Sequence, residues 1–566
     1  PMVTHVHGAH VGPVSDGYPE AWWLPNANNL AGYATTGTFY DTSAPADAGS
    51  AVYTYPNTQP STTLWYHDHS LGITRLNVYA AGAGFWLIRE ANDGESGLMA
   101  GTLPGPAPVA GQDPNTDPAV RATIREIPIA IQPKSFNLDG SQYFPAARAF
   151  FEGLGTGQVF SDNTGVNIPF LPQVTSDISP VWNPEAFFNT MVVNGKTWPV
   201  LEVAPERYRF RLLNAADSRF LNLAMFRVRG DGTINPSQEL PFYQIGAEQS
   251  LLPQVVRIET GFATPLLGDG RDICTGNSGG RNPNCISAVP GTFAQQALLM
   301  GPSERADVIV DFTGLDDGTR VRIVNTAPDA PFGGFPDAPA DPATTGQVME
   351  FVVNSALANP AGDPSTPAPS LVLDTNPGGV PKLGLSAVTQ DLALLEEESA
   401  LLCVTIDVVT GVIDLDPNSV PPICDPVLGS VPFGPMAAVL GVNGSAGGTP
   451  QLWDDPIATN PALNSVETWE LWNWSADAHP IHLHLVKFEV VNRQVIGGAV
   501  RAAEPWEAGW KDTVIAYPGE VTRVTALFDI AGLYVWHCHI LSHEDNEMMV
   551  PFCVGDPVNC TPPVVQ

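Results

Sequence analysis

The sequence predicts an all-β fold made of three β-sandwich domains. Its 566 residues exceed the size of one ordinary domain, so two or three hydrophobic cores are expected. The 53 glycines and 55 prolines place turns throughout the chain. Between these turns lie short runs rich in Val, Thr, Phe and Tyr, such as "RYRFRLLNA" and "ADVIVDF", which are typical of strands. Many short strands separated by turns favour stacked β-sheets.

Composition divides the chain into three blocks. Residues 1–92 hold aromatic, alternating segments such as "STTLWYHDHS" and "GAGFWLIRE", and residues 93–120 follow as a linker rich in Gly, Pro and Asp. The second block, residues 121–354, runs from "REIPIAIQPKSF" to "VMEFVVN". Residues 355–385 form a second linker, and residues 386–566 contain "VETWELWNWS", "VKFEVVNR" and "LYVWHCHI". We expect each block to be one β-sandwich domain.

The acidic composition excludes several classes of partner. Asp and Glu outnumber Lys and Arg by 59 to 25, which gives a formal net charge of −34. Such a surface repels nucleic acid and anionic membranes, so neither is an expected partner. The sequence has no apolar run of about 18 residues, so membrane insertion is not expected either. Composition alone does not choose between a saline and an acidic habitat as the reason for this charge.

Seven cysteines leave one without a partner. Proximity suggests the disulfides Cys274–Cys285, Cys403–Cys424 and Cys553–Cys560, although spacing alone permits other connectivities. Disulfides indicate a location outside the reducing cytosol, so extracellular, periplasmic or on the cell or spore surface. The chain begins inside the strand-like stretch "PMVTHVHG", so we expect a targeting segment and earlier strands to be missing from this sequence. The remaining cysteine, Cys538, needs another explanation.

Ten of the eleven histidines fall in four clusters, and only His10 stands apart. The clusters are "HVH", "HDH", "HPIHLH" and "HCHILSH". Side chains two residues apart lie on the same face of a strand, so each His-x-His presents two imidazoles on one side. The four pairs supply eight imidazoles: His5, His7, His67, His69, His482, His484, His537 and His539. Eight imidazoles are too many ligands for one metal ion and about the right number for three metal ions.

The same alternation predicts a second site on the other face. Cys538 lies between His537 and His539, so its side chain points away from theirs. His479 precedes His482 by three residues and belongs on the face of Cys538, while His543 and Met548 follow the strand and can return to the thiol. Two imidazoles, a thiolate and a thioether describe a blue-copper centre. Cys538 therefore joins two sites, and its main chain gives electrons a short covalent route to either neighbouring histidine.

These motifs, their order and their spacing resemble those of the multicopper oxidases. The similarity is closest to the bacterial laccase branch that includes spore-coat laccase and bilirubin oxidase-like enzymes. It rests on "HDHSLGITRLNVYAAGAGFWLI", "VNGKTWPVLEVAPERYRFRLLNA", "GPSERADVIVDF", "DAHPIHLHLVKFEVV" and "YVWHCHILSHEDNEMM". The resemblance implies three cupredoxin-like Greek-key domains, the first incomplete at its N-terminus.

The resemblance also implies four copper ions and a ligand set for each. One type 1 copper is expected at His479, Cys538 and His543, with Met548, favoured over Met549 by the family's spacing, as a weak axial ligand. The type 2 copper is expected at His5 and His482. The two type 3 coppers are expected at two sets of imidazoles, one being His7, His67 and His539 and the other His69, His484 and His537. Asp16 and Glu544 match the acids that deliver protons for oxygen reduction.

The resulting hypothesis is a laccase-type oxidase. A small reducing substrate, such as a phenol, an aromatic amine or a bilirubin-like pigment, is expected to dock at an exposed edge of His543. Four electrons then pass through Cys538 and reduce O2 to two waters at the trinuclear cluster. An axial methionine is expected to hold the type 1 potential at a moderate value. A monomer is favoured.

Alternatives remain open. A metallo-oxidase for Mn(II) or Fe(II) suits the acidic surface, but the sequence alone places no compact carboxylate cluster. Rates with Mn(II), Fe(II) and a phenolic dye would distinguish it from a laccase. A cuprous oxidase is disfavoured because the nine methionines are scattered, and a nitrite reductase because His-Cys-His implies a type 3 pair. A copper-binding or coat-structural protein would show only background oxygen uptake when loaded with copper.

Overall fold

A computed structural model describes most of the chain. The described ranges are residues 1–25, 31–43, 47–89, 102–109, 111–112, 116–145, 177–179, 182–260, 297–335, 338–373, 382–406, 413–416, 421, 423–444 and 447–560. Strands dominate these ranges and helices are few and short, so the predicted all-β fold is confirmed. The helices are α1 (Thr74–Tyr79), α2 (Pro118–Arg121) and α5 (Leu541–Glu544). Short 3₁₀ turns are η1 (Pro13–Ser15), η4 (Ser355–Leu357), η5 (Ala368–Ser370), η6 (Pro505–Glu507) and η7 (Pro557–Cys560).

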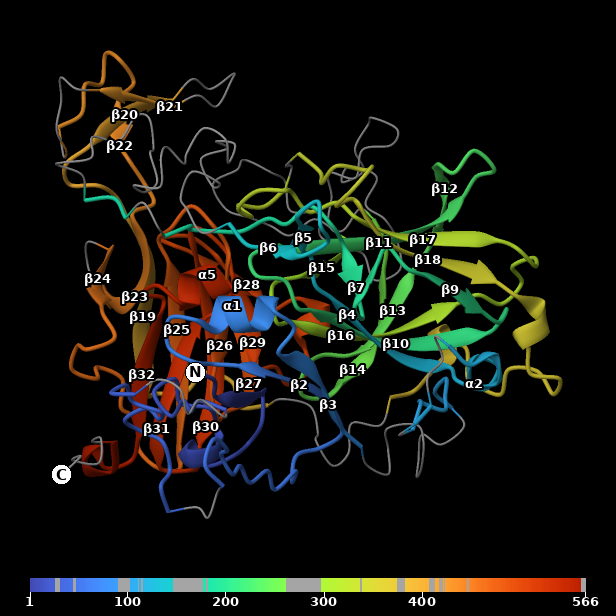
Figure 1. The fold of residues 1–566 in the computed structure, drawn as a ribbon, viewed down its shortest axis with the longest axis horizontal. Helices are drawn as coiled ribbons and strands as arrows, with labels where there is room; N and C mark the ends of the chain where they lie inside the picture. The colour runs from blue at the N-terminus through green and yellow to red at the C-terminus, as the bar shows by residue number, and fades with distance from the viewer. Residues whose placement is uncertain are drawn as a thin grey trace.

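The first block contributes one antiparallel sheet. Its order is β1 (Thr4–His7), β2 (Thr62–Asp68) and β3 (Ala83–Ile88). Val6, Leu64 and Ile88 form a small buried core beneath these strands. In Figure 1 these blue strands run between the red and orange sheets of the third block and the green sheets of the second. The first block therefore bridges the other two.

The second block forms two sheets packed face to face. One sheet has the order β14 (Leu251–Ile258), β13 (Phe242–Gly246), β16 (Arg305–Asp311), β10 (Arg207–Asn214), β4 (Glu126–Ile131), β7 (Val192–Val193) and β8 (Lys196–Thr197). The other has the order β12 (Ile234–Leu240), β11 (Leu221–Val228), β17 (Arg320–Asn325), β18 (Gln347–Val353) and β9 (Val200–Val203), with β15 (Leu298–Met300) paired to β11. Phe210 of β10 stacks on Phe351 of β18 at a centroid distance of 5.2 Å. This contact joins the two sheets through a shared core. A separate short hairpin pairs β5 (Ser135–Phe136) with β6 (Gln142–Tyr143).

The third block forms a second sandwich. Its larger sheet has the order β24 (Gly447–Gln451), β23 (Ala437–Gly444), β19 (Thr389–Glu397), β25 (Ser465–Asn473), β30 (Glu520–Phe528), β27 (Phe488–Val495) and β28 (Val500–Ala502). Its smaller sheet has the order β29 (Thr513–Ala516), β26 (His479–Leu483), β31 (Gly532–Cys538) and β32 (Met549–Val554). Trp469 of β25 meets Trp536 of β31 edge-on at 5.8 Å between the two sheets. A small side sheet pairs β21 (Ile413–Asp416), β20 (Cys403–Ile406) and β22 (Val431–Pro432). The strands of each sheet come from one block, while the domain boundaries themselves stay a prediction.

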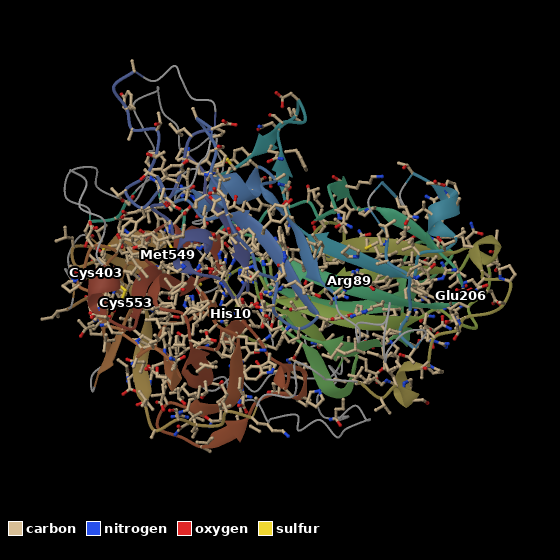
Figure 2. All side chains as sticks on the ribbon, turned by 90° about the horizontal axis from the view of Figure 1, so that it is seen from below. His10, Arg89, Glu206, Cys403, Met549 and Cys553 are labelled. Atoms are coloured by element: carbon tan, nitrogen blue, oxygen red, sulfur yellow. A yellow bond between two sulfur atoms is a disulfide. The ribbon has the colours of Figure 1, made fainter. Side chains whose placement is uncertain are left out.

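Two of the three suggested disulfides are present. Cys403 bonds to Cys424, and Cys553 bonds to Cys560. The pairing of Cys274 with Cys285 falls outside the described residues. Cys553 lies near Met549 at the third block's end of the molecule, whereas Glu206 lies at the far end, in the second block (Figure 2). Among the described residues, no helix is both long and apolar enough to cross a bilayer.

Candidate metal centre

Two neighbouring strands, β26 and β31, place the histidines and the cysteine of the third block. In their antiparallel register, Ile481 lies opposite Cys538 and His482 lies opposite His537. Because successive side chains alternate between faces, His479 shares the face of Ile481 and therefore that of Cys538. His482 and His537 share the opposite face. The alternation predicted from the sequence is thus present in the sheet.

The Cys538 face holds a compact group of three possible ligands. The Cys538 Sγ atom lies 3.6 Å from Nδ1 of His479 and 3.9 Å from Nδ1 of His543. All three side chains are buried, and their ligand atoms lie within 4.8 Å of one another. Burial lowers the pKa of His479 to about 3, so its imidazole is neutral and able to bind a metal. A thiol between two neutral imidazoles fits a soft or borderline metal such as copper.

Met548 lies beside this group, whereas Met549 does not. The side chain of Met548 belongs to the same buried cluster as Cys538 and Ile540. Met549 packs in another cluster with Val535. The main chain also ties Met548 to the group, because its N–H donates to His543 O and its carbonyl accepts from Cys538 N. This packing supports the choice of Met548 as the axial ligand, which stays a prediction.

The eight imidazoles of the four His-x-His pairs come together in one buried cluster. His5 lies opposite His67 in the β1–β2 register, so the first block supplies one side of the cluster. The strands β26 and β31 and the residues just after them supply the other side. The Nε2 atoms lie 3.3 Å apart in three pairs: His69 with His537, His484 with His537, and His67 with His539. Every one of the eight side chains is buried.

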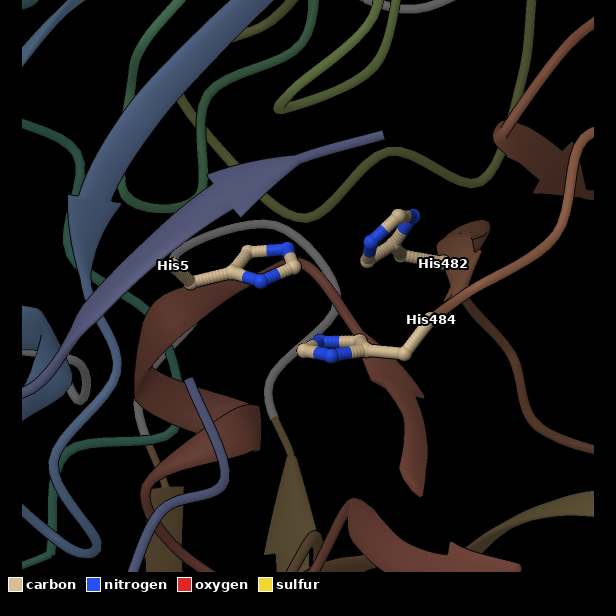
Figure 3. A group of neighbouring side chains, drawn as sticks. All are labelled: His5, His482 and His484. Carbon is tan, nitrogen blue, oxygen red and sulfur yellow. The ribbon is translucent and has the colours of Figure 1, made fainter. Parts of the chain in front are cut away.

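Main-chain carbonyls fix the orientation of several of these rings. The Nδ1–H groups of His5 and His482 donate to the carbonyls of Asp16 and Asp512 at 2.6 and 2.7 Å. Their Nε2 atoms are buried and have no hydrogen-bond partner among the described residues. A ring that donates through Nδ1 keeps a lone pair on Nε2, which is the atom that a metal would take. Figure 3 shows the rings of His5, His482 and His484 turned toward a common space.

Burial favours the neutral form of most of these imidazoles when no metal is bound. It lowers the pKa of His5, His482 and His484, and the neighbouring imidazoles lower these pKa values further. Buried neutral imidazoles with partnerless Nε2 atoms, such as those of His5 and His482, fit copper ions that keep open coordination positions. His69, His484 and His537 form one three-residue group, and His5 falls in groups with either His482 or His7. The geometry thus gathers the predicted ligands, while their division among ions stays a prediction.

The two predicted acids lie against the imidazole cluster. Asp16 Oδ2 accepts a hydrogen bond from His484 Nδ1 at 2.9 Å, and burial raises the pKa of this carboxyl group well above its usual range. Glu544 places one oxygen 3.2 Å from Nδ1 of His537 and the other 3.5 Å from Nε2 of His69. Both acids are buried. Their positions support a role in holding protons, which stays a prediction.

Asp512 is a neighbour of the cluster that sequence reasoning missed. Its Oδ1 accepts from Nε2 of His7 at 3.1 Å and from Arg305 at 2.8 Å. Gln249 donates to its Oδ2 at 2.6 Å. Arg305 and Gln249 belong to the second block, more than 200 residues away in the chain. The only local sign of Asp512 in the sequence is the charged pair of Lys511 and Asp512 in "GWKDTVIAY", directly before an apolar strand.

The expectation that His543 has an exposed edge is wrong. The side chain of His543 is 1% exposed. Glu185 covers it, with Oε1 3.7 Å from Nε2 of His543. The short-range pattern of the sequence contains no information on this contact, because the two residues lie in different blocks. His10, in contrast, bonds to Asp529 at 2.8 Å and is not part of either group (Figure 2).

Two β-sandwiches bridged by a third sheet, a cysteine between two imidazoles, and eight further imidazoles behind it are typical of a copper oxidase. A multicopper oxidase family model matches residues 435–558. The chain is 30% identical to a laccase of Bacillus stratosphericus over 97% of its own length and 79% of the relative's. The chain therefore belongs to the multicopper oxidase family, and it is a laccase-like, copper-dependent oxidoreductase that uses O2.

Solved structures show the same fold. A multicopper oxidase of Aquifex aeolicus superimposes with a TM-score of 0.53 at 20% identity, covering 98% of this chain and 84% of that one. A multicopper oxidase of Campylobacter jejuni, described as a metallo-oxidase, gives a TM-score of 0.54 at 16% identity, with 98% and 80% coverage. At these identities the likeness concerns the fold alone.

Proposed function

We propose that the protein holds four copper ions and couples four one-electron oxidations to the reduction of O2 to two waters. The type 1 ion is assigned to His479, Cys538 and His543 with Met548. The type 2 ion is assigned to His5 and His482, and the two type 3 ions to the remaining six imidazoles: His7, His67 and His539, and His69, His484 and His537. The observation that carries the proposal is the position of Cys538, whose thiol faces one group while its two chain neighbours face the other.

Bound copper would supply the one-electron chemistry, taking single electrons from a donor and giving four to O2. The chain supplies the connection between the two groups, because His537, Cys538 and His539 are joined by consecutive peptide bonds. It also excludes water, since every proposed ligand is buried. Phenols, aromatic amines and bilirubin-like pigments are the proposed organic donors.

Protons must also reach the imidazole cluster, because reduction of one O2 to two waters consumes four of them. Asp16 is suited to hold one, since burial favours its neutral form. Its Oδ1 has no hydrogen-bond partner among the described residues. Glu544 occupies the equivalent position beside His537 and His69. We assign both acids to proton delivery.

Replacement of the shared cysteine tests the proposal directly. Cys538→Ser should lose one copper per chain, the blue absorption band and oxygen uptake with a phenolic dye, because serine is a poor ligand for a soft metal site. His10→Ala is the control, since His10 bonds Asp529 outside both groups. Metal analysis, an optical spectrum and an oxygen electrode supply the measurements. Turnover that survives in Cys538→Ser contradicts the assigned electron route.

The location and the partners are proposed from the disulfides and the net charge. The two disulfides support an extracellular, periplasmic or cell- or spore-surface location. The net charge of −34 supports the absence of nucleic acid among the partners. We propose a monomer, which sedimentation of the copper-loaded protein would test.

A further inference from the structure

A cavity of about 440 Å³ lies between the first and second blocks. Its walls come from β3 of the first block and from β4, β7, β8 and β10 of the second. This volume is in the range of pockets that bind small organic molecules. The lining residues include none of the proposed copper ligands, so the cavity is separate from the metal centre.

The lining of the cavity is mostly apolar and carries a single charge. Phe85, Phe136 and Leu213 are its largest apolar residues. Lys134 is the one charged side chain among the described residues that line it, and no Asp or Glu is among them. A cavity of this kind favours a ligand with an apolar body and a negatively charged group.

Lys134 is a buried cation without a counter-ion. Its side chain is 5% exposed, and its ammonium group has three N–H donors. One N–H donates to the carbonyl of Tyr79, and Nζ lies 4.6 Å from the centre of the Tyr79 ring. None of the described residues supplies another hydrogen bond or an ion pair to this group. Burying a charge without an opposite charge costs several kcal/mol, so an anion is the partner that Lys134 lacks.

A second buried lysine shows how the same chain treats this group elsewhere. Lys511 lies 2.7 Å from Glu248 and 3.1 Å from Glu304. Burial lowers the pKa of Lys511, but these two carboxylates outweigh burial and raise the pKa above its usual range. Burial lowers the pKa of Lys134 to about 8, and no acidic group offsets it. Lys134 is therefore still charged at pH 7, but it has no acid beside it.

We propose that this cavity binds an aromatic carboxylate, with the carboxylate group beside the ammonium of Lys134 and the ring against the apolar lining. The carboxylate supplies the missing counter-ion and accepts the N–H groups that Tyr79 leaves over. The ring covers apolar surface of Phe85 and Leu213, which a small inorganic anion would leave exposed to water. Binding involves no covalent step, and the site goes beyond the proposed oxidase function.

The bound ligand should also stabilise the contact between the two blocks. In the register of β2 with β3, Phe85 lies opposite Trp65. Trp65 and Leu213 belong to one buried apolar cluster, and Phe85 packs against it. This cluster joins the first block to the second. A ligand that binds the folded chain here therefore raises its unfolding temperature.

The test titrates benzoate into the copper-loaded protein by isothermal titration calorimetry. The wild type should bind one benzoate per chain, and its Tm should rise with the benzoate concentration. Lys134→Met keeps the apolar stem of the side chain but removes the ammonium group, so it should weaken benzoate binding about tenfold or more. Lys196→Met is the matched control, because Lys196 is exposed on β8 and does not line the cavity. Equal affinity for benzoate in Lys134→Met and the wild type would overturn the proposal, and benzoate bound at copper would give that result.

A comparison of ligands covers the case in which Lys134→Met folds poorly. Benzamide has nearly the shape of benzoate but no charge, so the wild type should bind it about tenfold more weakly or worse. Acetate carries the charge without the ring and should also bind more weakly than benzoate. Benzamide binding as tight as that of benzoate would show that Lys134 does not recognise the carboxylate. Absence of benzoate binding to the wild type would overturn the proposal outright.

Discussion

Cys538 shows how one residue can belong to two sites. It ends strand β31, where Tyr534, Trp536 and Cys538 share the face that packs into the sandwich core. The thiol is buried, and burial raises its pKa well above the usual range, so the metal-free protein holds a neutral thiol. Copper binds the thiolate, so loading the site must release this proton. Copper affinity at this site should therefore increase with pH.

The assignment of the axial ligand can be tested with two adjacent methionines. Met548→Leu removes a weak thioether donor from the type 1 copper, which should raise the reduction potential and shift the blue absorption. Met549→Leu is the matched control, because Met549 packs in a separate core cluster with Val535. Potentiometric titration followed by the blue band measures both variants. Equal potentials for Met548→Leu and the wild type would rule out Met548 as the axial ligand.

At the scale of the element, the turn after β1 holds the first block's histidines in place. His5 Nδ1 donates to the carbonyl of Asp16, and Gly17 follows directly with φ at +82°. A Cβ atom on Gly17 would lie 2.7 Å from Cβ and 2.8 Å from Cα of His5. The turn and the strand can therefore stay together only if residue 17 has no side chain.

Gly17→Ala should displace β1 and reduce the copper content. The left-handed backbone conformation alone costs an alanine ~1–2 kcal/mol, and overpacking against His5 adds ~1–3 kcal/mol. Gly140→Ala is the matched control, because Gly140 has φ at +86° but nothing within 4 Å of the added Cβ. Urea unfolding and copper analysis should show a larger loss of stability for Gly17→Ala, and a loss of copper only there. A normal copper content in Gly17→Ala would contradict a tight link between the turn and His5.

The features of the site that could be predicted from the sequence are those that depend on the alternation of side chains along a strand. The opposite faces of Cys538 and its neighbouring histidines follow from strand alternation, and so does the position of His479. Contacts between distant segments could not be predicted in this way. Glu185 reaches His543 from a segment more than 300 residues earlier, and nothing in either segment signals the meeting.

At the scale of the whole molecule, the copper site lies where the three blocks meet. Arg211 of the second block donates to Thr63 Oγ1 of the first at 2.9 Å. Lys511 of the third block lies 2.7 Å from Glu248 and 3.1 Å from Glu304 of the second. These contacts are buried. Removing one charged partner would therefore leave the other charge buried and unpaired, which is strongly destabilising. The second block supplies none of the proposed copper ligands, yet its polar side chains hold the other two blocks together.

Arg305 of the second block links this support directly to the imidazole cluster. Its guanidinium donates to both oxygens of Asp512, and both side chains are completely buried. Asp512 in turn accepts from His7 through its side chain and from His482 through its carbonyl. Arg305→Met keeps much of the volume but leaves Asp512 as an uncompensated buried charge. Loss of one partner of a buried pair typically costs about 3–5 kcal/mol.

We therefore expect Arg305→Met to lower the free energy of unfolding by about 3–5 kcal/mol and to reduce the copper bound per chain. Arg320→Met is the matched control, because Arg320 is partly exposed in its pair with Glu350, and such pairs contribute about 0–1 kcal/mol. Adding Asp512→Asn to Arg305→Met removes the stranded charge and should recover part of the stability. If the double variant regains stability but not its copper, the pair of Arg305 and Asp512 orients His7 and His482 in addition to stabilising the fold. Full copper content in Arg305→Met would show that the second block does not position these ligands.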